Sequence, residues 1–202
     1  MGKRGKKNSK NQWTDSLTLK AKKENYPARS VYKLKEIQAK FKILKKGDSV
    51  LDLGCSPGSW LLYASQCVGG KGRILGIDLK TVDIKLPENS SAFVGNILDF
   101  PSQLNDFAEK GCDAVLSDMA PATTGRKDVD AARSFELCET ALNCAIKSLK
   151  PGGTFVCKIF QGSEFNEFTK TIKSNFKISK IFKPDSCRKA SKEIYIIGKN
   201  RN

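Results

Sequence analysis

Residues 50–60, VLDLGCSPGSW, predict how the rest of the chain is arranged. The apolar and β-favouring residues 49–53 predict a buried strand, and Gly54 and Gly58 predict a tight turn after it. An amphipathic helix is expected to begin directly after this turn. Such a turn lets a ligand approach the backbone closely, and the helix start offers free N–H groups. The stretch therefore indicates a ligand-binding strand–turn–helix unit.

The next strand, GRILGIDL, supplies an acidic residue for the same ligand. Asp78 lies near its end, 20 residues beyond Gly58. An acid at this offset is well placed to accept hydrogen bonds from the two hydroxyls of a ribose. Together, the turn and Asp78 predict a nucleoside-containing cofactor without saying which one.

The glycine turn differs from a dinucleotide site, which needs the pattern G-x-G-x-x-G. Here the sequence is GCSPG, and Pro57 removes a backbone donor that a pyrophosphate would use. The pattern resembles the D-x-G-x-x-P-G loop of Rossmann-type methyltransferases, which bind S-adenosyl-L-methionine. An ordinary βα turn with structural glycines is the alternative.

Composition narrows the class of protein. The 202 residues, 39% of them hydrophobic, suffice for one domain with a substantial core. No apolar run of about 18 residues and no secretory signal pattern is present, so we expect a cytoplasmic protein without membrane contact. The seven cysteines form no C-x-x-C pair and histidine is absent, so we expect free thiols and no metal. The lack of histidine also excludes Ser-His and Cys-His nucleophilic catalysis.

The positive charge is concentrated at the N-terminus. Residues 1–46 contain fifteen Lys and Arg and three acidic residues, a net charge of +12, whereas the other 156 residues carry +3. This segregation predicts binding to a polyanion, with nucleic acid the leading candidate. We expect a disordered basic arm at 1–12, basic helices within 13–46, and a catalytic domain at 47–202.

Strand and helix patterns alternate along the rest of the chain. Strands are predicted at residues 49–53, 73–78, 92–95, 113–118, 154–160, 176–182 and 193–198, and helices at 13–25, 29–41, 59–67, 102–110, 129–149 and 164–174, with Ser102 as a helix cap. This order predicts an α/β fold with a mostly parallel, doubly wound, seven-stranded sheet and helices on both faces. No helix separates the last two strands, so the final strand should be antiparallel and should begin, at Glu193, beside the ligand crevice.

Three charged residues are predicted to meet at this crevice. Asp118 closes the fourth strand, Lys158 interrupts the apolar fifth strand, and Glu193 opens the seventh. Each has a simple alternative explanation: a turn residue, a lysine snorkelling to water, or an exposed strand start. Because the three coincide at one edge, a functional cluster is the better hypothesis.

The motifs DLGCSPGSW, SDMAP, KIFQG and SKEIYII resemble the FtsJ-type RNA ribose 2′-O-methyltransferases. The resemblance covers about residues 28–198. The length and single-domain plan are similar to those of bacterial members that modify a uridine of large-subunit ribosomal RNA. The resemblance therefore implies a Rossmann-like fold, S-adenosyl-L-methionine as cofactor and ribosomal RNA of the large subunit as partner. It also implies a contribution to ribosome assembly and a monomeric protein.

The resemblance also implies site residues. The family's Lys-Asp-Lys-Glu tetrad corresponds to Lys33, Asp118, Lys158 and Glu193, and Lys33 is identified only in this way. Cofactor contacts correspond to Gly58, Trp60, Asp78, Asn96 and Asp118. Asn96 departs from the family pattern, which has Asp there, so its contact with adenine would involve a neutral amide.

These residue types fit transfer of a methyl group to a hydroxyl. A ribose 2′-hydroxyl must lose its proton as it attacks the sulfonium methyl in line, which needs positioning and a base but no metal. Lysine is ordinarily protonated, so a lysine base needs desolvation or a nearby cation, for which Lys33 is the candidate. The sequence leaves open whether Lys158 removes the proton or stabilises the alkoxide. Asp118 and Glu193 are expected to orient the lysine and the hydroxyl.

Residues 121–128 and 183–192 are basic and flank the same edge, so with the N-terminal arm they predict an RNA-binding rim.

Several alternative functions remain. The chain could be a methyltransferase for a base, a protein or a small molecule, a non-catalytic RNA-binding assembly factor, or an NAD-dependent oxidoreductase. Within the resembled family, transfer RNA or a messenger-RNA cap remains an alternative substrate.

Overall fold

The computed structural model describes residues 15–202 except 100 and 189, so the expected basic arm at 1–12 lies outside the described residues. Two helices come first, α1 (Asp15–Lys23) and α2 (Val31–Phe41). Leu34 and Ile37 of α2 are fully buried in the same apolar cluster as Val50 of the central sheet. Each such side chain contributes roughly 1.5–3 kcal/mol when fully buried, so α2 is held firmly against the domain.

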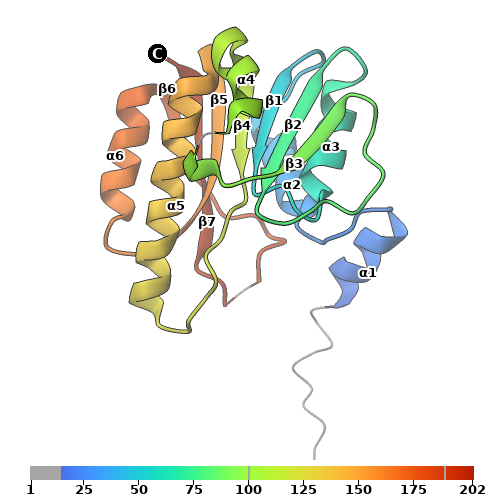
Figure 1. Ribbon diagram of the computed structural model, residues 1–202. Helices are drawn as coiled ribbons and strands as arrows, with labels where there is room; N and C mark the ends of the chain where they lie inside the picture. Colours follow the sequence, from blue (N-terminus) through green and yellow to red (C-terminus); the bar gives the residue numbers. More distant parts are fainter. Residues whose placement is uncertain (1–14, 100, 189) are drawn as a thin grey trace, which may run out of the picture.

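Within the described residues, a seven-stranded sheet forms the centre of the molecule (Figure 1). The strands follow the order β3-β2-β1-β4-β5-β7-β6 across the sheet. The pairs among the first five strands in this order are parallel, and β7 is antiparallel to both β5 and β6. The predicted mostly parallel sheet with an antiparallel last strand is therefore confirmed. The strands are β1 (Ser49–Leu53), β2 (Arg73–Asp78), β3 (Ser90–Val94), β4 (Cys112–Ser117), β5 (Leu149–Phe160), β6 (Phe176–Phe182) and β7 (Glu193–Arg201).

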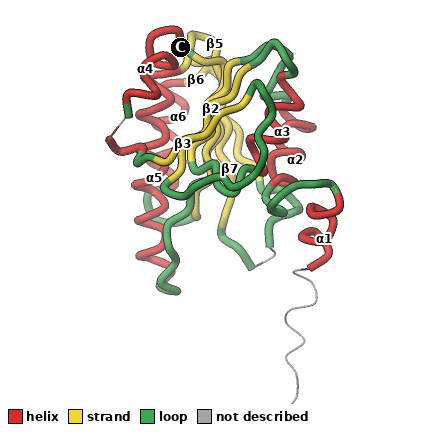
Figure 2. The backbone as a smooth tube through the Cα atoms, turned by 45° about the vertical axis from the view of Figure 1, so that its right-hand side comes forward, coloured by secondary structure: helices red, strands yellow, loops and turns green. Residues whose placement is uncertain are grey.

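Helices cover both faces of the sheet (Figures 1 and 2). One apolar cluster joins the sheet to α4 (Asn105–Lys110), α5 (Lys127–Ser148) and α6 (Phe165–Asn175). A second cluster joins the opposite face to α2 and α3 (Ser59–Val68). Side chains alternate along a strand, so odd-numbered Leu51 and Leu53 belong to the first cluster and even-numbered Val50 to the second.

Several predicted element bounds are wrong for local reasons. β4 ends at Ser117, so Asp118 lies just after the strand rather than closing it. β5 begins at Leu149 instead of 154, because residues 150–153 form an irregularity inside the strand, where its register against β4 shifts. Ser102 does not cap a helix; it begins a short 3₁₀ turn, and α4 starts only at Asn105.

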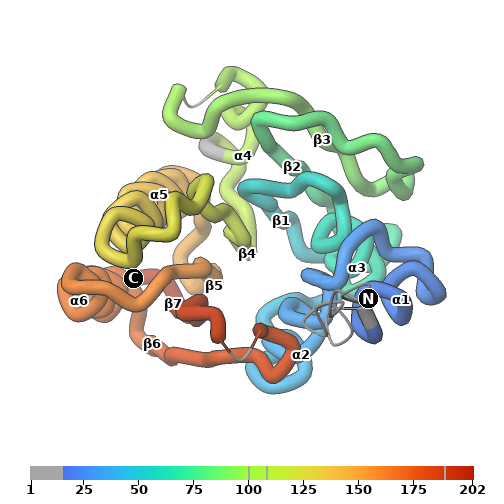
Figure 3. Tube along the Cα trace, turned by 90° about the horizontal axis from the view of Figure 1, so that it is seen from below, coloured from blue at the N-terminus to red at the C-terminus, as the bar shows by residue number. Residues whose placement is uncertain are grey.

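The carboxyl ends of the parallel strands lie together at one edge of the sheet, which faces the viewer in Figure 3. Because β7 is antiparallel, it begins at this edge, and Glu193 pairs with Phe160 at the end of β5. The loops after β1, β2 and β4 and the start of β7 therefore meet here, where ligands of open α/β sheets bind.

Candidate active site

The glycine turn after β1 is tightly packed. Gly54 and Gly58 have φ angles of 77° and 105°, which residues with a Cβ rarely adopt. A Cβ on Gly54 would lie 2.6 Å from the side chain of Met119, and one on Gly58 would lie 2.6 Å from that of Ile84. The turn therefore requires glycine at both positions, for its conformation and for its close packing.

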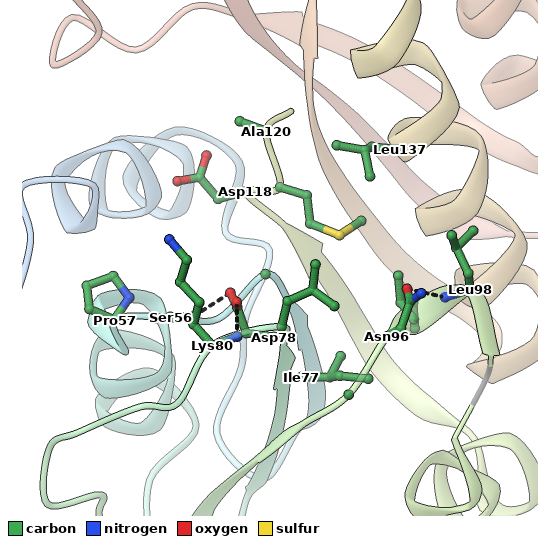
Figure 4. Close-up of a pocket in the computed structure, with 15 residues that line it drawn as sticks. Ser56, Pro57, Ile77, Asp78, Lys80, Asn96, Leu98, Asp118, Ala120 and Leu137 are labelled. Atoms are coloured by element: carbon green, nitrogen blue, oxygen red, sulfur yellow. Dashed lines mark hydrogen bonds between the residues drawn. The ribbon is translucent and has the colours of Figure 1, made fainter. Parts of the chain in front are cut away.

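A cavity of about 570 Å³ opens beside this turn (Figure 4). Much of its wall is apolar, and the polar side chains of Asp78, Asn96 and Asp118 converge on it from the ends of three strands. Its volume and its mixture of apolar walls with a few polar groups are typical of a site for a small organic ligand. The apolar residues include Ile77, Leu79, Ile97, Leu98, Met119 and Leu137.

Asp78 lies at the cavity wall and organises the two loops next to it. Its Oδ2 accepts a hydrogen bond from the Ser56 N–H at 2.9 Å, and its Oδ1 accepts one from the Lys80 N–H at 2.9 Å. Each carboxylate oxygen has a further lone pair, so Asp78 retains the capacity to accept ligand hydroxyls. Asn96 uses its Oδ1 to accept the Leu98 N–H at 3.1 Å, which leaves its amide N–H groups as donors.

Gly58 and Trp60 are not among the residues that line the cavity. The Trp60 indole is buried, lies 6.0 Å from the Tyr195 ring between centroids, and donates its N–H to the Ser30 carbonyl at 2.9 Å. Its side chain therefore supports the fold. The Gly58 N–H donates to the Cys55 carbonyl at 2.7 Å, so a cofactor contact through a backbone N–H is open to Trp60 but not to Gly58.

The four predicted tetrad residues come together at one edge of the cavity. Lys158 Nζ lies 3.0 Å from Asp118 Oδ1 and also donates a hydrogen bond to the main-chain carbonyl of Asp118. Lys33 Nζ lies 2.9 Å from Glu193 Oε2 and 4.0 Å from Asp118 Oδ1. The side chains are only 6–16% exposed. Asp118 thus links the two lysines.

Charge compensation sets the ionisation of this cluster. Burial raises the pKa of Asp118, but Lys158 and Lys33 outweigh burial, so its pKa lies below the usual range. Burial lowers the pKa of Lys33, but Asp118 and Glu193 outweigh it, so this pKa is raised. Asp118 is therefore a carboxylate and Lys33 an ammonium at neutral pH.

Tyr195 is a member of the cluster that the sequence analysis missed. Its hydroxyl donates a 2.5 Å hydrogen bond to Asp118 Oδ1, and burial, followed by the Asp118 charge, raises its pKa. In the β5–β7 register, Tyr195 pairs directly with Lys158. Strand alternation gave a usable signal, because Tyr195 follows Glu193 by two residues and so shares its face.

The loop before β7 also contacts the cluster. Burial, followed by the Glu193 charge, raises the pKa of the Cys187 thiol to about 12, so this thiol is neutral. Arg29 donates a hydrogen bond to the Ser186 carbonyl at 2.7 Å. A hollow of about 260 Å³ lies here, and its lining includes Arg29, Lys33, Arg188 and Glu193. We call it the Arg29 hollow.

Comparison with known proteins identifies the family. A model for the FtsJ-like methyltransferases matches residues 26–201. The ribosomal RNA large subunit methyltransferase E of Desulforapulum autotrophicum is 62% identical over 192 residues, which are 95% of this chain and 95% of that protein. The chain belongs to the FtsJ-like methyltransferase family. The predicted family and enzyme class are therefore confirmed.

Solved structures agree with this FtsJ-like assignment. A ribosomal RNA methyltransferase from Plasmodium falciparum is similar with a TM-score of 0.77 and 31% identity, covering 87% of this chain and 98% of that chain. Fibrillarin from Aeropyrum pernix, solved with bound S-adenosyl-L-methionine, has a TM-score of 0.60 at 18% identity over 84% of this chain and 76% of that chain. The second similarity concerns the fold alone, which is the predicted Rossmann-like one.

The described residues of this FtsJ-like chain contain no group of three or more His, Cys, Asp or Glu side chains placed to hold a metal ion. Within the same part of the chain, no helix combines the length and apolarity that a membrane span requires. All seven cysteines are free thiols, and six of them are buried.

Proposed function

We propose that this protein transfers the methyl group of S-adenosyl-L-methionine to a ribose 2′-hydroxyl in large-subunit ribosomal RNA. The nucleotide would be a uridine and the modification would contribute to ribosome assembly, as the resemblance implies. The observation that carries the proposal is the contact of Lys158 with Asp118 at the cavity edge, compensated by Lys33, Glu193 and Tyr195. A named relative, the large subunit methyltransferase of Desulforapulum autotrophicum, supports the substrate.

The cavity fits the proposed cofactor. Asp78 would accept hydrogen bonds from its ribose hydroxyls, and Asn96 would contact the adenine edge with its amide. Leu79 and Leu98 line the cavity and are 71% and 68% exposed, so they offer apolar surface to a flat base. The cofactor's carboxylate would suit the Trp60 N–H and its neighbours at the start of α3, since the Gly58 N–H already donates to the Cys55 carbonyl.

The reaction needs a hydroxyl held in line with a sulfonium methyl, which the cofactor supplies. Lys158 Nζ has one bond to Asp118 Oδ1 and one to the Asp118 carbonyl, which leaves a third direction for the 2′-oxygen. In that position, the neutral amine of Lys158 would accept the hydroxyl proton as the oxygen attacks the methyl group, and would become an ammonium. Lys33 would add a fixed positive charge that favours the alkoxide, and Glu193 would keep Lys33 in place.

RNA would reach the tetrad through the Arg29 hollow. Lys33 and Glu193 belong to both the tetrad and the lining of this hollow, and Arg29 and Arg188 add positive charge suited to phosphates. The basic arm at 1–12 remains a predicted further contact.

Two measurements test the proposal. Ribose 2′-O-methyl marks would be mapped on total RNA from cells with and without the protein, and one mark in large-subunit RNA should disappear without it. Loss of a mark in transfer RNA or a messenger-RNA cap, or of a base methylation instead, would overturn the assignment of the substrate.

Calorimetry should show binding of S-adenosyl-L-methionine but not NAD, and Asp78→Ala should weaken that binding. A comparable affinity for NAD would overturn the assignment of S-adenosyl-L-methionine as the cofactor.

A further inference from the structure

A second hollow adjoins the cofactor cavity and has no role in the site described above. Its volume is about 570 Å³, and its lining includes Pro27, Ser56, Pro57, Lys80 and Asp83. Ser56, Pro57 and Lys80 also line the cofactor cavity, so the two spaces share a border. We call this space the Lys80 groove.

Lys80 is the one lysine or arginine that lines either space within the described part of the chain. Its backbone is fixed, because its N–H donates to Asp78 Oδ1 at 2.9 Å. Its side chain is exposed, and Figure 4 shows the amino group lying between Pro57 and Asp118 at the border of the cavity. Among the described residues, no hydrogen bond or ion pair engages this ammonium group. The border therefore carries a cation without an anionic partner.

We propose that Lys80 binds a backbone phosphate of the RNA strand beside the nucleotide that is methylated. This inference rests on the proposed function and extends it to a residue outside the tetrad. A phosphodiester is the anion that an RNA substrate brings to every nucleotide step, and a lysine binds it as a point charge.

The position of the groove fits a strand that passes over the tetrad. Pro27 lines the Lys80 groove and Arg29 lines the Arg29 hollow, so the two spaces are bordered by residues of one short segment. This segment is anchored on α3, since Ser59 Oγ accepts the Ala28 N–H at 2.8 Å and donates to the Ala28 carbonyl at 3.0 Å. A strand with its target ribose at the tetrad would meet Lys80 on one side and Arg29 and Arg188 on the other.

The charges around Lys80 disfavour the other available ligand, the cofactor. The sulfonium of the cofactor is positive, so it would be repelled by the Lys80 ammonium. The carboxylate of the cofactor already has a suitable site at the start of α3. Asp83, which accepts a hydrogen bond from Thr81 Oγ1 at 3.2 Å, places a negative charge elsewhere in the groove. The phosphate is therefore assigned to the Ser56–Pro57 side, where Lys80 borders the cavity.

The test compares Lys80→Ala with Lys85→Ala, an exposed lysine on the same loop that lines neither space. RNA affinity is measured with a labelled single-stranded RNA oligonucleotide at several salt concentrations, and cofactor affinity is measured by calorimetry. KM and kcat are measured with unmethylated large subunits as substrate. Lys80→Ala should weaken RNA binding about tenfold, lower the salt slope by about one, and raise KM for subunits while kcat changes little. Lys80→Arg should restore binding, and Lys85→Ala should match the wild type.

Each other result overturns the inference. A Lys80→Ala variant that loses cofactor affinity and keeps RNA binding would make Lys80 a cofactor ligand. A variant equal to Lys85→Ala in every assay would make Lys80 an ordinary surface lysine. Failure of the proposed function gives a different result. A wild-type protein that binds the oligonucleotide but methylates no ribose would contradict the proposed function, and the comparison of RNA affinities between the variants would still be valid.

Discussion

Two neighbouring strands, β1 and β4, each have an aspartate at or just after their end, and the two aspartates have opposite surroundings. Asp118, just after β4, contacts Lys158, Lys33 and Tyr195. Asp52, in β1, is fully buried, and neither of its carboxylate oxygens has a hydrogen-bond partner among the described residues. Asp52 lies on the α2–α3 face of the sheet, since Val50 of the same alternation packs there, and Asp118 contacts Tyr195 of that face.

The difference shows that partners, rather than burial, decide which carboxylate is charged. Burial raises the pKa of both groups, but only Asp118 has cations close enough to reverse the effect. The pKa of Asp52 is raised well above its usual range by burial, with further contributions from the Asp118 and Asp78 charges. Asp118 therefore anchors a lysine pair as a carboxylate, whereas burial without a cation favours the protonated form of Asp52.

The largest expected effect comes from removing the lysine that contacts Asp118. Lys158→Ala should lower methyl transfer to large subunits by about a thousandfold, within the range of a lost acid–base group, while the protein still folds and binds cofactor. Transfer of labelled methyl groups at saturating cofactor measures this. Lys158→Arg should fail almost as badly, because a guanidinium is planar and is not deprotonated. Near-normal turnover in Lys158→Ala would make Lys158 a snorkelling strand-end lysine.

The second effect concerns the shared carboxylate itself. Asp118→Asn removes the charge that both lysines face and changes a wall of the cavity, so turnover should fall about a hundredfold and cofactor affinity should also fall. Kinetics and cofactor calorimetry on the same sample separate the two losses. Asp113→Asn is the matched control, because Asp113 pairs with Lys150 at the opposite end of β4. Equal losses in both variants would indicate general destabilisation.

A smaller effect is expected for the supporting carboxylate. Glu193→Gln keeps a hydrogen-bond acceptor for Lys33 but removes the charge, so turnover should fall about tenfold with cofactor affinity unchanged. Single-turnover kinetics on large subunits measure it. A loss as large as that of Lys158→Ala would give Glu193 a direct part in proton transfer.

The smallest effect should follow Tyr195→Phe. The variant keeps the ring beside Trp60 but removes the hydrogen bond to Asp118 Oδ1. Because the two lysines remain, kcat should fall only a few-fold, in line with one lost hydrogen bond to a charged group that keeps other partners. Unchanged KM for cofactor would support a positioning role, and unchanged kcat would contradict it.

The fold and most of the cluster were predictable from the sequence. Strand–helix alternation gave the sheet, and the lack of a helix before β7 gave the antiparallel strand that brings Glu193 to the active edge. Asp118 and Lys158 were visible because charges interrupt or follow apolar strands. The irregularity in β5 was not visible, since the sequence of residues 150–153 favours a turn whether it lies before a strand or inside one.

Residues whose role depends on docking were harder to find. Lys33 lies on a helix with other lysines, and only the packing of α2 against α3 turns it toward Glu193. In the sequence, Tyr195 cannot be told from an ordinary apolar strand residue, because its contact with the cluster depends on the pairing of β7 with β5. The Trp60 side chain is buried and its indole N–H bonds to the Ser30 carbonyl, so its predicted cofactor contact would have to use its backbone. Local patterns do not encode these contacts between distant segments.

The most direct test of the central claim is the unfolding free energy of Asp52→Asn and Asp118→Asn, measured in urea between about pH 4 and pH 8. The folded pKa of Asp52 is raised, so the wild type loses stability as pH rises above about 3.9. Asp52→Asn should therefore be more stable at neutral pH by at least about 1 kcal/mol, and the gain should vanish near pH 4.

The folded pKa of Asp118 is lowered, so its stabilisation is present above about pH 3.9 and is lost as pH falls through the lower folded value. Asp118→Asn should be less stable at neutral pH by about 3 kcal/mol, as for a broken buried ion pair. Changes of opposite sign at neutral pH are the predicted result. A loss of stability in Asp52→Asn, or a gain that does not depend on pH, would contradict the account.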